Sequence, residues 1–143
     1  MPDRTTQLRE VEEANAAFYA AFESADLDAM QDLWLEDPDT LCVHPGALPV
    51  RGTSSINRSW ALIMANTPYI QFFLTDVEVS VWENAASVTC TENVLTADER
   101  HGTDTFGGAR AVATNVFVHT PAGWRLWIHH ASPVLSMGDH EDE

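Results

Sequence analysis

The hydrophobic pattern in the first half of the chain predicts three helices. In the first helix, the apolar positions with helical spacing are Leu8, Val11, Phe18 and Phe22. We expect this helix to end near Ser24, and a second, short helix to follow with Asp26 as its N-cap. The second helix stops at Asp37-Pro38, because the residue before a proline avoids the helical region. A third helix begins at Gly52 and ends before Pro68.

After Pro68 the pattern changes to two-residue alternation, which predicts four consecutive strands. In the first strand, the parity of Ile70, Phe72 and Leu74 changes to that of Val77, Val79 and Val81. This switch predicts a bulge near Thr75-Asp76 that bends a long strand. The other three strands are expected over residues 85–97, 108–119 and 124–134. A shorter strand is expected over residues 40–44, between the second and third helices.

This order of elements predicts a fold of the α+β class. Three N-terminal helices pack on one face of a strongly curved, mainly antiparallel sheet, which gives a cystatin-like, cone-shaped half-barrel. The pocket of such a domain lies between the helices and the concave face of the sheet. We expect one folded domain over residues 8–134, with a disordered N-terminus at 1–7 and an acidic flexible tail at 135–143.

The strongly acidic composition narrows the set of partners. Seven basic and 22 acidic side chains give a net charge of −15, which disfavours binding to nucleic acid or to an anionic membrane. No apolar run reaches the ~18 residues that a membrane span needs, and the polar N-terminus lacks the apolar core of a signal peptide. A cytoplasmic protein is therefore expected, with Cys42 and Cys90 as a reduced, buried pair in apolar strands.

Two histidines near strand ends are the candidate acid/base groups. On strict alternation, the closing strand turns Trp124 and its same-parity neighbours toward the helices, so His130 projects into the pocket. There His130 either contacts a ligand or transfers protons, or it is a buried neutral imidazole satisfied by hydrogen bonds. His44 ends a short strand, where it either contacts a ligand or stabilises a turn. Trp127 has the opposite parity and needs cover, which points to a homodimer formed through the sheet.

Other polar side chains interrupt apolar faces and are candidate ligand contacts. Asn15 and Tyr19 lie on the first helix, while Glu92 and Asn115 lie on strands among apolar neighbours. If Glu92 faces the helices, burial raises its pKa and it can act as a base; if it faces outward, it is a surface residue. The aromatic residues that either line a flat cavity or fill the core are Trp34, Trp60 and Phe72.

Four segments resemble one known superfamily and cover nearly the whole domain. They are residues 15–22 (NAAFYAAF), 26–34 (DLDAMQDLW), 42–46 (CVHPG) and 123–133 (GWRLWIHHASP). They resemble SnoaL-like domains of the nuclear transport factor 2-like superfamily, and the last is similar to the closing strand of kinase association domains. The resemblance implies a dimer and, by analogy with dehydratase-like members, that His44 and His130 approach each other.

The superfamily combines enzymes with non-catalytic association modules, so the resemblance leaves two functions open. One is cofactor-independent dehydration, isomerisation or cyclisation of a small apolar molecule, with His130 and His44 as acid/base groups. The other is a non-catalytic module that binds a ligand or joins subunits. The acidic arrangements of isomerase and epoxide hydrolase members are not visible. No metal site is expected, since Cys42 and His44 supply two ligands where a structural zinc takes four.

Overall fold

The computed structural model describes residues 3–97 and 106–135. Within these residues the chain forms helices and strands in an order that confirms the expected α+β class. The elements are α1 (Arg4–Glu23), α2 (Leu27–Leu33), β1 (Leu41–Val43), β2 (Val50–Arg51), α3 (Thr53–Ala65), β3 (Ile70–Trp82), β4 (Ala85–Ala97), β5 (Phe106–Thr120) and β6 (Gly123–Pro133). The expected tail from residue 136 onward and most of the loop after β4 lie outside the described residues.

Side-chain caps explain where the first two helices begin. The Asp3 carboxylate accepts a hydrogen bond from the Thr6 backbone N–H at 2.8 Å, and α1 begins at Arg4. The helix therefore includes residues 4–7, which were expected to be disordered. Asp26 accepts from the Ala29 N–H at 3.0 Å, which confirms it as the N-cap of α2.

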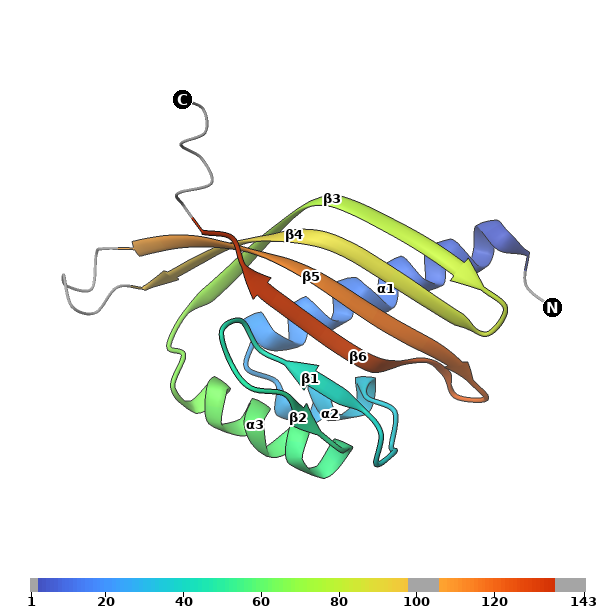
Figure 1. The fold of residues 1–143 in the computed structure, drawn as a ribbon, viewed down its shortest axis with the longest axis horizontal. Helices are drawn as coiled ribbons and strands as arrows, with labels where there is room; N and C mark the ends of the chain where they lie inside the picture. The colour runs from blue at the N-terminus through green and yellow to red at the C-terminus, as the bar shows by residue number, and fades with distance from the viewer. Residues whose placement is uncertain (1–2, 98–105, 136–143) are drawn as a thin grey trace.

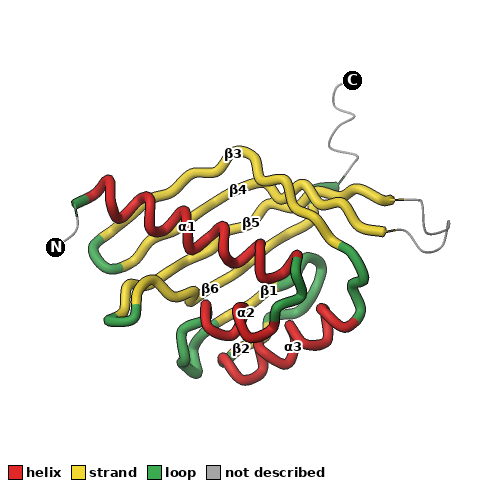
Figure 2. The backbone as a smooth tube through the Cα atoms, turned by 180° about the vertical axis from the view of Figure 1, so that it is seen from behind, coloured by secondary structure: helices red, strands yellow, loops and turns green. Residues whose placement is uncertain are grey.

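The sheet has six strands in the described residues, in the order β2-β1-β6-β5-β4-β3 (Figure 1). Strands β3 to β6 form the expected antiparallel meander, and β1 joins β6 in parallel. The two-residue strand β2, which no sequence pattern indicated, pairs with β1 at the edge. Seen from behind, α1 lies along the meander, with α2 and α3 beside β1 and β2 (Figure 2). All three helices cover the same face of the sheet.

Two bulges decide which side chains face the helices. In β3, the register with β4 shifts between Thr75 and Glu78, and Asp76 has a φ of +54°, which confirms the expected bulge. In β6, Leu126 pairs with Phe117 and Ile128 pairs with Val116, so Trp127 is an extra residue with no partner on β5. The strict alternation expected for the closing strand is therefore wrong after Leu126.

The core lies between α1, α2, α3 and the inner face of the meander. Its largest fully buried apolar side chains include Trp60, Phe18, Phe117 and Met30. The two cysteines are free thiols and buried, as expected. Among the described helices, none combines the length and apolar character needed to cross a membrane.

Candidate functional site

A cavity of about 320 Å³ opens between the helices and the inner face of the sheet. Its walls are apolar and largely aromatic: α1 and α3 contribute Phe18, Phe22 and Trp60, and β3 contributes Phe72. The aromatic rings pack edge to face, with Phe22 and Trp60 centroids 4.9 Å apart. Such a cavity suits a small, mainly apolar ligand.

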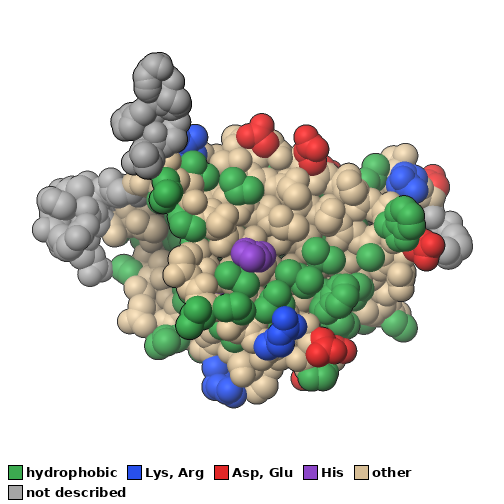
Figure 3. Space-filling view, viewed as in Figure 1, with side chains coloured by type: hydrophobic (Ala, Val, Ile, Leu, Met, Phe, Trp, Pro, Cys, Tyr) green, Lys and Arg blue, Asp and Glu red, His purple; other side chains and the backbone are tan. Residues whose placement is uncertain are grey.

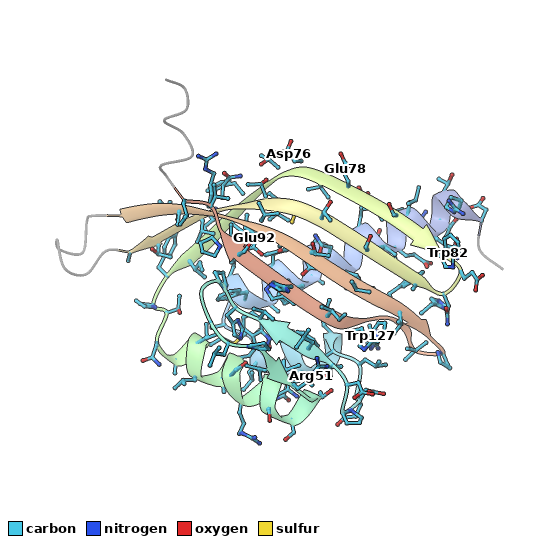
Figure 4. The ribbon with its side chains drawn as sticks, in the orientation of Figure 1. Arg51, Asp76, Glu78, Trp82, Glu92 and Trp127 are labelled. Carbon is cyan, nitrogen blue, oxygen red and sulfur yellow. The ribbon has the colours of Figure 1, made fainter. Side chains whose placement is uncertain are left out.

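Three titratable side chains from three parts of the fold converge on this cavity. Glu92 comes from the inner side of β4 (Figure 4), His129 from β6, and His44 from the loop directly after β1. The rings of His44 and His129 are 6.4 Å apart between centroids. Because β1 pairs with β6 in parallel, Cys42 lies opposite His129, and this register places His44 beside it.

A buried hydrogen-bond network connects two of these groups through the core. The Tyr19 hydroxyl donates to Glu92 Oε2 at 2.5 Å, and Asn115 Nδ2 donates to the Tyr19 oxygen at 3.3 Å. Asn115 Nδ2 also donates to Asn15 Oδ1 at 2.8 Å, and Asn115 Oδ1 lies 2.6 Å from His129 Nδ1. The network therefore runs from Glu92 to His129, and each of its buried members has at least one hydrogen bond.

Burial sets the charge states at the cavity. Loss of hydration raises the pKa of Glu92, and the hydrogen bond from Tyr19 offsets part of that rise. Burial lowers the pKa of His129 to about 3, with smaller contributions from the charges of His44 and His130. It lowers the pKa of His44 as well. The cavity thus combines a carboxyl group with an elevated pKa and two imidazoles that are neutral at pH 7.

A model of the family described as "SnoaL-like domain" matches residues 11–136 of the chain. The chain belongs to the SnoaL-like domain family. This domain is 48% identical to a solved structure from Streptomyces avermitilis, described as a "putative dehydratase from the NTF2-like family". The match has a TM-score of 0.85 and covers 93% of this chain and 99% of that one.

Two further relatives have other descriptions. A "putative calcium/calmodulin-dependent protein kinase type II association domain" from Thiobacillus denitrificans is 30% identical, with a TM-score of 0.76 and coverage of 87% of this chain and 94% of that one. The F-box protein SKIP8 of Arabidopsis thaliana is 25% identical over 133 residues, which are 93% of this chain. The chain spans about half the length (53%) of this curated relative.

His130 does not reach the cavity of this SnoaL-like domain, so the prediction that it projects inward is wrong. The extra residue Trp127 shifts the parity of β6, which turns His129 inward and leaves His130 exposed on the outer face. The histidine that approaches His44 is therefore His129. Sequence reasoning missed His129 because, unlike the valines of β3, the residues around Trp127 show no change of parity that would mark a bulge.

The other expected site residues divide into two groups. Trp60, Phe72, Glu92 and His44 line the cavity. Asn15, Tyr19 and Asn115 are buried in the network behind the cavity wall, so their expected role as ligand contacts remains a prediction that would need the wall to open. Trp34 is buried beside Leu126, to which it forms a parallel bridge, and it lies away from the cavity.

The donors present do not form a cation site. Within residues 3–97 and 106–135, no three His, Cys, Asp or Glu side chains are placed to hold one metal ion. Cys42 Sγ lies 3.6 Å from His44 Nε2, but burial raises the pKa of this thiol, which disfavours the thiolate that binds metals.

Proposed function

We propose that this SnoaL-like domain is a cofactor-independent acid/base enzyme of the dehydratase type, which acts on a small, mainly apolar molecule. The observation that carries this proposal is the convergence of Glu92 with two neutral imidazoles on one apolar cavity. Burial raises the pKa of this carboxyl group, which is the direction of shift that makes a carboxylate a stronger general base. The 48% identity to the Streptomyces avermitilis protein supports dehydration among the possible reactions.

Glu92 has the geometry needed to act as the proton acceptor. Its Oε2 is held by Tyr19, whereas its Oε1 has no hydrogen bond from the described residues. Within residues 3–97 and 106–135, the fully enclosed side-chain atoms without a partner are Trp34 Nε1, Trp60 Nε1 and Asn57 Oδ1. Glu92 Oε1 is not among them, and it therefore reaches open space in the cavity. Tyr19 keeps the carboxyl group in a fixed orientation, which reduces the reorganisation that proton transfer requires.

A single carboxylate is sufficient for the dehydration. Glu92 removes a proton from the carbon beside a carbonyl group, the electron pair forms a carbon–carbon double bond, and the bond from the neighbouring carbon to its hydroxyl group breaks. The departing hydroxyl group takes the proton back from Glu92 and leaves as water. Glu92 returns to its starting state, so the step needs no metal, oxidant or second acid.

Loss of water from β-hydroxy ketones tests this proposal. 3-Hydroxycyclohexanone and larger ring analogues would be incubated with the protein in D₂O and followed by NMR for water loss and for deuterium uptake beside the carbonyl group. We expect the wild type to catalyse both, Glu92→Gln to lose both, and Glu78→Gln, on the outer side of β3, to retain both. Wild-type turnover by Glu92→Gln would exclude Glu92 as the base, and binding without turnover would favour a non-catalytic module.

We also propose that a second copy of the chain covers the outer face of the sheet. This face exposes Phe73, Val112 and Trp127, with 53%, 47% and 36% of their surface accessible. Figure 3 shows apolar side chains across the face around a central histidine, with acidic side chains toward its edges. Two copies of a chain with a net charge of −15 repel each other. The repulsion is weakest where the contacting surface carries few acidic groups, so this face is the one best suited to a contact between copies.

The mass in solution tests this arrangement. We expect light scattering after size exclusion to give twice the chain mass for the wild type and one chain mass for Trp127→Glu. Leu48→Glu is the matched control, because Leu48 is an exposed apolar side chain in the loop between β1 and β2. A monomeric wild type would exclude the dimer.

A further inference from the structure

Asn115 is the centre of the buried network, although no ligand in the cavity can touch it. Its side chain lies on the inner side of β5, directly opposite His129 of β6, and none of its surface is accessible. Its carboxamide makes three hydrogen bonds, to Asn15, Tyr19 and His129. Any effect of Asn115 on a ligand must therefore pass through one of these neighbours.

The count of donors and acceptors determines how the carboxamide is oriented. Tyr19 has one hydroxyl proton, and it is donated to the Glu92 carboxylate, so the Tyr19 oxygen can only accept from Asn115. The amide nitrogen of Asn115 must then face Tyr19 and Asn15, which leaves its oxygen toward His129. A carboxamide oxygen can only accept, so the proton of the neutral His129 ring is on Nδ1.

The other ring nitrogen of His129 is consequently an acceptor that opens into the cavity. His129 Nε2 has no hydrogen bond from the described residues and is not one of the fully enclosed unpartnered atoms, while the residue lines the cavity. His44 presents the same polarity: Ser59 gives its own proton to the Ile56 carbonyl at 2.7 Å, so it accepts from His44 Nε2–H at 3.1 Å. The lone pair of His44 is then on Nδ1, which lies 3.9 Å from the Cys42 thiol.

We propose that Asn115 is a specificity-determining positioning residue, because it holds His129 with an unprotonated Nε2 toward the cavity. The cavity then binds a neutral ring compound whose hydroxyl group donates a hydrogen bond to this Nε2, and it rejects a carboxylate. A carboxylate ligand would place its oxygens against the lone pairs of His129 and against Glu92. Among the described residues, Arg110 is the cationic side chain that lines the cavity and could attract a carboxylate. It is exposed at the rim, and it already interacts with another group of the protein. The inference rests on the proposed function only in using the same cavity, and it concerns binding, not turnover.

The first test measures the His129 tautomer in the wild-type protein. Long-range ¹H–¹⁵N NMR of ¹⁵N-labelled histidines separates a protonated ring nitrogen from a bare one. At pH 7.5 we expect His129 with the proton on Nδ1, opposite to the tautomer that free histidine prefers in water. A His129 ring with its proton on Nε2, or a doubly protonated ring, would overturn the proposal.

The second test compares two probes of one shape, 2-naphthol and 2-naphthoate, by calorimetry. We expect the wild type to bind 2-naphthol at least about tenfold more tightly, because 2-naphthoate cannot donate the hydrogen bond to His129 Nε2. Equal or tighter binding of 2-naphthoate, or no binding of 2-naphthol, would contradict the proposal. Because both probes report binding alone, these outcomes are independent of whether the domain catalyses dehydration.

Two substitutions then locate the effect at Asn115. In Asn115→Asp, the new carboxylate beside Nδ1 favours the protonated ring, so Nε2 becomes a donor and the preference should move toward 2-naphthoate by about tenfold or more. Asn15 can rotate its amide to donate to the new carboxylate. Asn115→Leu removes the hydrogen bond without adding charge, and we expect it to weaken the preference without reversing it. An unchanged preference in a folded Asn115→Asp protein would overturn the proposal; if that variant does not fold, the wild-type tautomer decides.

Discussion

His129 should make the folded protein sensitive to mild acid. In the unfolded chain a histidine takes up a proton below about pH 6.5, whereas burial keeps His129 neutral until the pH reaches about 3. Between these values the unfolded state binds more protons than the folded state. The free energy of unfolding therefore falls as the pH decreases through this window, and the contribution of His129 is fully retained above about pH 6.5.

The size of the effect follows from the two pKa values. Each unit of difference corresponds to ~1.4 kcal/mol, so complete titration of His129 costs about 5 kcal/mol of stability. At pH 5 the loss is already about 2 kcal/mol. Domains of this size are typically stable by ~5–15 kcal/mol, so His129 alone would remove a substantial fraction of the total.

Urea unfolding followed by tryptophan fluorescence measures this loss at pH 7.5 and pH 5. Carboxyl groups and His44 titrate in every variant. The relevant quantity is therefore the loss of unfolding free energy from pH 7.5 to pH 5, compared between wild type and His129→Gln. We expect the wild type to lose about 2 kcal/mol more than His129→Gln over this range. His130→Gln, which removes the exposed neighbour, should behave like the wild type. The same pH dependence in wild type and His129→Gln would refute the assignment of His129 as a buried neutral group.

Three further variants test the core, the network and a helix cap. Tyr19→Phe removes the hydrogen bond that holds down the pKa of Glu92, so that pKa should rise further, as followed by ¹³C NMR of the carboxyl group; no change would contradict the role of Tyr19. Trp60→Ala should cost ~3–5 kcal/mol in urea unfolding, because it empties a fully buried site at the cavity wall. Asp26→Ala should cost ~1 kcal/mol through loss of the α2 cap, whereas the neighbouring Asp28→Ala should cost less.

The periodic spacing of apolar residues along the chain was sufficient to predict most of the fold. The bounds of β4 and the cap of α2 agree with the expectation, because each follows from local patterns in the sequence: parity, a side-chain cap or a turn. The bulge of β3 was readable because the apolar residues before Thr75 and the valines after it differ in parity. Strand β2 was not readable, since two residues such as Val50 and Arg51 carry no period.

The candidate site was predicted less completely because its contacts are distant in sequence. Asn15 and Asn115 are bonded although 100 positions separate them, and nothing local to either residue names the partner. The choice between His129 and His130 depended on one extra residue in β6. Trp127 could occupy an unbroken strand equally well, and its role as the bulge residue follows from its pairing geometry with β5. The types of polar residue in the site were thus predictable, but their pairings were not.

The cost of the buried network argues that it serves the cavity and does more than stabilise the fold. Asn15, Asn115 and His129 occupy buried positions where apolar side chains of similar size would need no hydrogen-bond partners. Replacing such buried polar groups by apolar ones is often neutral or stabilising, so stability alone does not explain them. At the cavity the network presents Glu92 Oε1 and His129 Nε2, both without a hydrogen bond from the described residues. A buried network that extends to the ligand space in this way presents those two atoms to a ligand, which is the arrangement that binding and proton transfer require.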